Sequence, residues 1–176
     1  MNIRRIILSV LAASALALLA SPTSVFAALG GSPQTANLTV QATVNARCTF
    51  SSTTTVDFGS YDPTSASPTD QNGAVTIQCT KGTVATINLG NGLNLSGGSR
   101  RMASQTLTTT EFLTYGLFTD SPGGTPWGTG IGGGTTKSYT AANASPTSIT
   151  VFGRMAAGQD VSVDSYQDTV VVTATF

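Results

Sequence analysis

Apolar side chains recur at every second position in several short runs of this chain, and this alternation restricts its fold most. In the run 38–45, Leu38, Val40, Ala42 and Val44 alternate with polar residues. A period of two predicts half-buried β-strands. Clusters of glycine, asparagine, proline and serine separate the runs, which predicts turns and an all-β antiparallel sandwich. The other inward-facing groups are Val75, Ile77 and Cys79; Ala85, Ile87 and Leu89; Leu113, Tyr115 and Leu117; Ile149 and Val151; and Val170, Val172, Ala174 and Phe176.

The composition argues against most enzyme classes. The chain has no histidine, and only 9% of its residues are charged. Histidine is the commonest general base and metal ligand, so its absence removes the usual nucleophilic and zinc sites. The aspartates lie mostly beside glycine, proline, serine or asparagine, where aspartate more often caps turns. We therefore expect no catalytic residue, no cofactor and no metal.

The first 27 residues are typical of a signal peptide. Arg4 and Arg5 precede an uncharged, largely apolar run over 6–20, and small residues at Val25 and Ala27 suit cleavage after Ala27. The apolar run is shorter than the ~20 residues that span a bilayer, so no integral membrane anchor is expected. The remaining chain is slightly acidic and offers no basic patch for nucleic acid.

Cys48 and Cys79 are the only cysteines. In an exported protein such a pair is expected to form a disulfide. It would close a loop of about 32 residues, worth roughly 3–4 kcal/mol on the loop-entropy model. We divide the exported chain into an N-terminal extension over 28–46 and a β-sandwich domain over 47–176.

The segment 121–137 contains seven glycines and two prolines, and its composition predicts a mobile loop. Trp127, the only tryptophan, lies in it. Two interpretations are open: Trp127 anchors the loop to the sandwich, or it is a surface aromatic that binds a sugar or a partner. Arg100 and Arg101 are expected in a solvated turn.

The two ends of the domain are unusual. The alternating run 38–45 follows a leader with glycine and proline, so it could pair within its own chain or be donated elsewhere. The run from Val170 to Phe176 ends in the middle of its alternation, with no partner strand after it. An open strand edge invites pairing, so we expect something to cover this one.

Eight short runs, spread over nearly the whole chain after the leader, carry a family resemblance by their order and spacing. They are Cys48-Thr49-Phe50, Phe58-Gly59-Ser60-Tyr61-Asp62-Pro63, Ile77-Gln78-Cys79-Thr80-Lys81-Gly82-Thr83, Leu89-Gly90-Asn91-Gly92, Arg100-Arg101-Met102, Leu113-Thr114-Tyr115-Gly116-Leu117-Phe118, Val151-Phe152-Gly153-Arg154-Met155 and Tyr166-Gln167-Asp168-Thr169-Val170-Val171-Val172-Thr173. With these runs the chain resembles the spore coat protein U domain family, which includes subunits of archaic, Csu-type chaperone–usher pili. One position departs from the pattern, since members often have glycine where this chain has Asp164, and the local turn there is not predicted.

The resemblance implies an immunoglobulin-like sandwich that lacks its final strand. A periplasmic chaperone lends a strand to the open groove, and at the outer-membrane usher the N-terminal strand of the next subunit replaces it. The resemblance thus implies a structural pilus subunit at the cell surface, whose partners are the chaperone, the usher and identical or related pilins. Leu38, Val40, Ala42 and Val44 would form the donor strand, and Val170, Val172, Ala174 and Phe176 would border the acceptor groove.

Two other functions remain open. The chain could be a secreted coat-layer protein, the role that named the family, or a surface module that binds glycans or acts as an adhesin. The sequence also leaves open whether the strand 38–45 folds into its own groove.

Overall fold

The computed structural model describes residues 31–176, so the expected signal peptide over 1–27 lies outside the described part. The chain divides into a unit that ends at Ala42 and a second unit over Thr43–Phe176. No residue from 31 to 47 belongs to a strand, and residues 31–176 contain no helix. The strands are β1 (Cys48–Thr54), β2 (Thr69–Cys79), β3 (Val84–Leu89), β4 (Arg100–Ser104), β5 (Phe112–Phe118), β6 (Lys137–Thr140), β7 (Thr147–Met155), β8 (Tyr166–Gln167) and β9 (Val172–Thr175).

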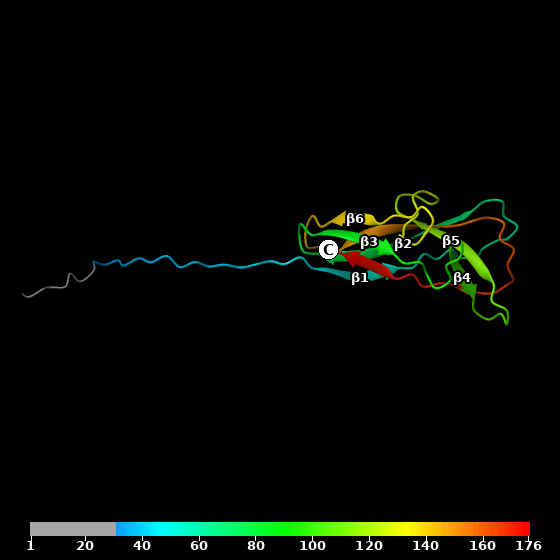
Figure 1. The fold of residues 1–176 in the computed structure, drawn as a ribbon, viewed down its shortest axis with the longest axis horizontal. Helices are drawn as coiled ribbons and strands as arrows, with labels where there is room; N and C mark the ends of the chain where they lie inside the picture. The colour runs from blue at the N-terminus through cyan, green and yellow to red at the C-terminus, as the bar shows by residue number, and fades with distance from the viewer. Residues whose placement is uncertain (1–30) are drawn as a thin grey trace, which may run out of the picture. The chain divides into compact units, whose positions relative to one another are not determined.

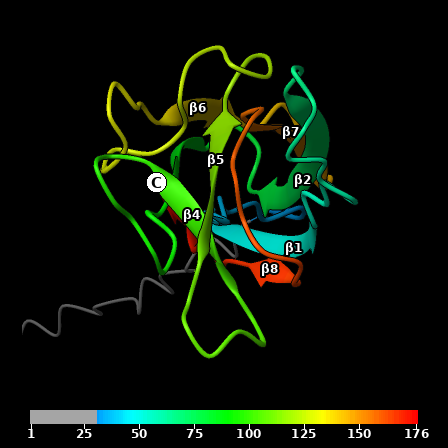
Figure 2. The ribbon, with the colours of Figure 1, turned by 90° about the vertical axis from the view of Figure 1, so that its right-hand side faces the viewer.

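The strands of the second unit form two antiparallel sheets. The larger sheet has the order β1-β2-β7-β5-β4-β8, and the smaller has the order β6-β3-β9. Figure 1 shows β9, coloured red at the C-terminal end of the chain, in the sheet with β3. β8 pairs with β4 at one edge of the larger sheet, and β1 is the strand at the other edge; Figure 2 shows β8 in orange-red and β1 in cyan. The terminal strands are therefore β1 and β8 in one sheet and β6 and β9 in the other.

One core joins the two sheets, and it consists mainly of residues that the alternation placed inward, together with Phe58, Trp127, Ala141 and Met155. Ile77 and Ile87, from the larger and the smaller sheet, are both fully buried. The expected all-β antiparallel sandwich is therefore confirmed. The buried members of the predicted groups are Val75, Ile77, Cys79, Ala85, Ile87, Leu89, Leu113, Tyr115, Leu117, Ile149 and Val151.

β9, over Val172–Thr175, is shorter than the strand expected over 170–176, and a further short strand, β8, precedes it. Tyr166–Gln167 pairs with β4 in the larger sheet, whereas Val172–Thr175 pairs with β3 in the smaller one. The segment 168–171 crosses from one sheet to the other. A period of two cannot reveal such a crossing, because alternation continues on both sides of it.

The glycine-rich segment 121–137 is a hydrogen-bonded loop, in contrast to the mobile loop that its composition predicted. Trp127 N donates to Leu117 O at 2.8 Å and ties the loop to β5. Within the loop, Gly128 N donates to Thr135 O at 2.8 Å, and Thr135 N donates to Pro126 O at 3.0 Å. The many glycines permit the tight backbone path that these bonds close.

Candidate functional site

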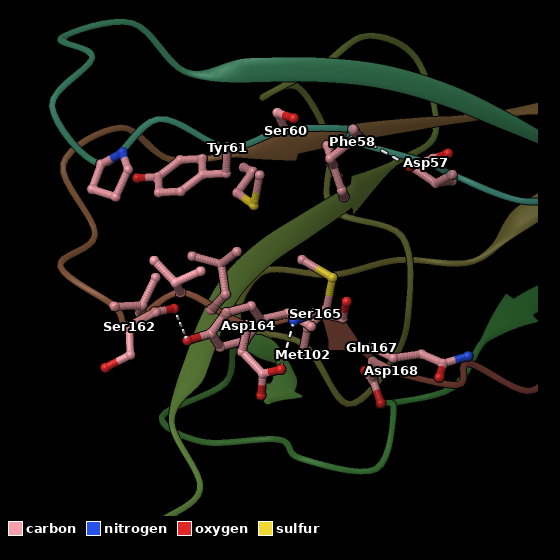
Figure 3. A pocket seen from close by; sticks show the side chains of 18 of the residues that line it. Asp57, Phe58, Ser60, Tyr61, Met102, Ser162, Asp164, Ser165, Gln167 and Asp168 are labelled. Carbon is pink, nitrogen blue, oxygen red and sulfur yellow. Dashed lines mark hydrogen bonds between the residues drawn. The ribbon is translucent and has the colours of Figure 1, made fainter. Parts of the chain in front are cut away.

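A groove opens into the core of the sandwich. It consists of two cavities of about 580 and 350 Å³, which share six lining residues and therefore adjoin. One wall is the end of β1 together with the chain that follows it, over 53–61, and the other is the segment 161–172. Figure 3 shows the larger cavity, with Phe58 and Tyr61 on one side and Ser162 and Asp164 on the other. The shared lining residues are Thr55, Val56, Phe58, Met102, Gln167 and Asp168.

Core side chains form the floor of this groove. Val75, Leu117 and Val151 line the smaller cavity, although each is less than a tenth exposed. Leu113 and Met155 line the larger one. The groove thus exposes part of the hydrophobic core. An apolar strand that filled the groove would bury additional apolar surface.

Strands with a free edge border the groove. Thr53 and Thr54 belong to β1, the last strand of the larger sheet, and Val172 belongs to β9, the last strand of the smaller sheet. A terminal strand carries unpaired backbone N–H and C=O groups that can bind another strand. The groove therefore combines an apolar floor with hydrogen-bonding edges.

Two glycines let the first wall lie close to the sheet. A Cβ atom on Gly73 would lie 2.7 Å from Val56 Cγ2, and one on Gly153 would lie 2.5 Å from Val56 Cγ1. Gly153 would also crowd Phe58 Cζ at 3.0 Å. Because these positions on β2 and β7 lack side chains, Val56 and Phe58 can pack directly onto the sheet. This packing fixes how closely the first wall approaches the sheet.

A polar cluster fixes the second wall. The Tyr115 hydroxyl donates to Asp168 Oδ2 at 2.6 Å, and Leu93 N donates to Asp168 Oδ1 at 2.8 Å. Gly92 makes room for the carboxylate, since a Cβ there would lie 2.0 Å from Asp168 Oδ2. Burial, strengthened by Asp168, raises the pKa of Tyr115, so the phenol stays protonated and remains a donor.

Arg100 is buried between the sheets rather than in the solvated turn that we expected. Its side chain is 1% exposed and donates to the carbonyl oxygens of Gly90, Leu89 and Trp127 at 2.8, 3.0 and 2.7 Å. Burial lowers the pKa of its guanidinium. Sequence reasoning missed this role, because two adjacent arginines beside glycine and serine are typical of a surface turn. Arg100 holds the end of β3 and the long loop behind the groove floor.

The interpretation of Trp127 as a surface aromatic is wrong. Trp127 is 0% exposed, and its Nε1 donates to Ile87 O at 3.0 Å. Lys137 Nζ lies 5.6 Å from the ring centroid. A ring that is fully enclosed offers no face to a sugar or a partner, and the alternative interpretation, an anchor for the long loop, fits the structure.

The C-terminal residues meet the groove only in part. Val170 and Val172 line the smaller cavity, and Ala174 is half-buried against the core. Phe176 lies beyond the end of β9 and is 55% exposed. Their assignment as the border of an acceptor groove stays a prediction.

The residues assigned to the donor strand are exposed. Leu38 is 87% exposed, Val40 85% and Val44 81%, and Ala42 is exposed as well. No strand pairing in residues 31–176 includes any of them. The apolar side chains of this segment remain exposed, although they would be buried if the segment paired with a sheet. Its role as a donor stays a prediction.

The disulfide lies at the start of the domain. Cys48 and Cys79 are bonded and face each other across the first register pair of β1 and β2. Within residues 31–176 we find no group of three potential metal-ligating side chains. No helix in the same part of the chain has the length and apolar character to cross a membrane.

The fold and the groove define a disulfide-bonded β-sandwich domain whose core is open between two strand edges. The chain belongs to the Spore Coat Protein U domain family, whose model matches residues 34–173. It is 35% identical over 156 residues to Protein U of Myxococcus xanthus, which covers 81% of this chain and 84% of that protein.

A solved structure also resembles this chain. It is the CsuC–CsuE chaperone–tip adhesion subunit pre-assembly complex from archaic chaperone–usher Csu pili of Acinetobacter baumannii. The TM-score is 0.49 at 24% identity, and the match covers 76% of this chain. The matched part spans 40% of the length of that solved chain.

Proposed function

We propose that this chain is a structural subunit of a secreted surface fibre that polymerises head to tail by donor-strand complementation. One subunit donates its strand 38–45, and the next accepts it in the groove described above. The observation that carries this proposal is the coexistence of a groove floored by Val75, Leu117 and Val151 with an exposed segment, 38–45, of matching apolar alternation. Membership of the Spore Coat Protein U domain family supports it.

The energetics of such a join are favourable. Full burial of Leu38, Val40 and Val44 would contribute about 1.5–3 kcal/mol each, and Ala42 would contribute less. Each backbone hydrogen bond to a strand edge would add roughly 0.5–1.5 kcal/mol. Because the two partner surfaces differ, the join is heterologous and can propagate into an open fibre.

The route to the surface follows from the same proposal. Residues 1–27 direct export, a periplasmic chaperone fills the groove of the free subunit, and an outer-membrane usher replaces the chaperone strand with that of another subunit. The sandwich then needs no catalysis, because strand exchange makes only non-covalent bonds.

The test is a pair of substitutions on opposite faces of the donor strand. Val40→Asp puts a charge on the face that enters the groove, whereas Gln41→Asp puts the same charge on the solvent face. In cells with the native assembly machinery, Val40→Asp should abolish fibres and Gln41→Asp should keep them, with both subunits exported. Normal fibres from Val40→Asp would contradict the donor-strand assignment.

A coat-layer component is the second candidate. The description of the matched family, Spore Coat Protein U, favours it. Such a protein would reach its layer without an usher, so deletion of the usher gene separates the two candidates. Surface display that survives the deletion favours the coat layer, and its loss favours the fibre. The glycan-binding alternative has lost its motivation, since Trp127 is buried.

A further inference from the structure

Two asparagine–glycine pairs occur in the chain, Asn72-Gly73 and Asn91-Gly92. Asparagine is a thermolabile residue, since the backbone nitrogen of the next residue can attack its side-chain amide. A glycine in the next position has no side chain to block this attack, and its backbone turns easily. The two pairs share this local chemistry, so the fold decides which of them reacts.

The pair Asn72-Gly73 is held in an inner strand. It lies in β2, which is flanked by β1 and β7, and Gly73 is buried opposite Val151. The ladder keeps this backbone extended. The Gly73 nitrogen can therefore turn onto the Asn72 side chain only when the strand opens locally.

The pair Asn91-Gly92 lies outside the strands, in the connection between β3 and β4. Asn91 is exposed, and Gly92 has a φ of +74°, which glycine adopts readily. Within the described residues 31–176, neither the Asn91 side chain nor Gly92 N makes a hydrogen bond. The attacking nitrogen and the amide carbon of this pair are therefore both free to react.

We propose that Asn91 is a site of spontaneous deamidation, with Gly92 N as the attacking atom. A bond forms between Gly92 N and Asn91 Cγ, and the bond from Cγ to Nδ2 breaks. The proton of Gly92 N leaves with the side-chain nitrogen as ammonia, and a succinimide ring remains. Water then opens the ring at either carbonyl carbon and gives aspartate or isoaspartate. Nothing is oxidised or reduced, and water is the only co-reactant.

The chain is fixed on both sides of this pair. Gly90 N donates to Val171 O at 2.8 Å, and beyond the pair Leu93 N donates to Asp168 Oδ1 at 2.8 Å. Residues 91–92 bridge these two fixed points. In isoaspartate the main chain runs through the former side chain, so the bridge becomes longer by one methylene group.

The longer bridge acts on the second wall of the groove. A Cβ atom on Gly92 would lie 2.0 Å from Asp168 Oδ2, so a displaced backbone at Gly92 would collide with this carboxylate. Deamidation also adds a negative charge at position 91, beside the glycine that contacts Asp168, and like charges repel. We expect Asp168 to lose the bond from Leu93 N and to keep the bond from Tyr115. The effect arises within one chain and needs no partner subunit.

The test ages the purified chain at mildly alkaline pH and maps its peptides by mass spectrometry. The exchange of an amide for a carboxyl group changes the peptide mass, and methylation by a protein isoaspartate methyltransferase identifies isoaspartate. In the native chain Asn91 should react at least about a hundredfold faster than Asn72, because Asn72 reacts only after local opening. In urea the two asparagines should react at similar rates.

Two matched variants assign the reaction to its residue. Asn91→Gln keeps an amide but would have to close a larger ring, so this variant should stay unmodified at position 91. Asn72→Gln should leave the reaction at Asn91 unchanged. Both substitutions are at exposed side chains, so both variants should fold.

Hydrogen exchange at the Leu93 amide measures the effect on the wall. Anion exchange separates the aged chains, which carry one more negative charge. In the isoaspartate form the Leu93 amide should exchange about tenfold faster or more, as expected when a bond to a charged acceptor is lost. Asn91→Asp adds the charge without the methylene group and should give a smaller increase.

Three results would count against the proposal. An unmodified Asn91 in the native chain, while both asparagines react in urea, would overturn it. Equal rates at Asn91 and Asn72 in the native chain would overturn the protection assigned to β2. An isoaspartate form whose Leu93 amide exchanges as slowly as before would overturn the link to the second wall.

Discussion

The Tyr115 hydroxyl lies 2.6 Å from Asp168 Oδ2, and this hydrogen bond joins the floor of the groove to its second wall. Tyr115 comes from β5 in the larger sheet, while Asp168 lies where the chain crosses toward the smaller sheet. The same carboxylate accepts from Leu93 N. Asp168 therefore fixes the position of the crossing segment 168–171 beside the core.

Removal of the Tyr115 hydroxyl should weaken the domain. Tyr115→Phe should lower the free energy of unfolding by about 1.5–3 kcal/mol, because the bond to a carboxylate is charge-assisted and half-buried. Denaturant unfolding measures it. Tyr139→Phe is the matched control, since that hydroxyl makes an exposed bond to Thr147 at 3.0 Å and should cost less. Equal losses in the two variants would contradict the role given to Asp168.

Arg100 should be far more important for stability than its neighbour. Arg100→Met leaves three carbonyl oxygens without their donor, at about 1–3 kcal/mol for each one that stays buried and unpaired. Arg101→Met removes one bond to Asn94 O from a half-buried side chain. We expect thermal unfolding to show a large drop for Arg100→Met and a small one for Arg101→Met. Similar drops would mean that the buried guanidinium contributes little.

Trp127 should report a closed environment. Its fluorescence in the native protein should be blue-shifted and resistant to quenching by iodide, and both properties should disappear in denaturant. Trp127→Ala should lower the free energy of unfolding by about 3–5 kcal/mol, as expected for a large buried aromatic. Efficient quenching in the native state would contradict the burial of the ring.

Asp164 should make stability depend on pH in the acid range. Hydrogen bonds from Thr106 N and Thr106 Oγ1 lower its pKa to about 2, below the value near 3.9 of an unperturbed aspartate. A depressed folded-state pKa stabilises the domain above pH 4, and this stabilisation is lost as the pH falls through about 2. Asp164→Asn should thus have a lower melting temperature at pH 6, and the difference should shrink toward pH 2. A difference that is constant with pH would contradict this assignment.

The alternation of the sequence predicted most of the core but not the walls of the groove. Val75, Ile77 and Leu117 face inward because strand geometry alone places every second residue on one face. The burial of Arg100 depends on three carbonyl groups that come together only in the folded domain. The packing of Val56 likewise depends on Gly73 and Gly153, which are on different strands.

The candidate site was predictable only in outline. The alternation of the run 38–45 and the family resemblance together assign these residues to a donor strand, and this assignment stays a prediction. The acceptor groove was likewise expected from the resemblance, and its lining residues are known only from the structure. Composition gave a wrong prediction for the loop 121–137, because residue frequencies do not reveal the backbone hydrogen bonds that fix a glycine-rich loop. The crossing at Asp168 was hidden for a similar reason, since alternation persists on both sides of it.

The most direct test of strand donation is a gel of surface protein, run in SDS with and without boiling. A strand that completes the core of another subunit should be slow to leave, so unheated samples should give a ladder of multimers that collapses to one band on boiling. A variant without residues 28–46, carrying the same signal sequence and expressed with the same assembly machinery, should give no ladder. A single monomer band from the unmodified protein in both samples would contradict the account.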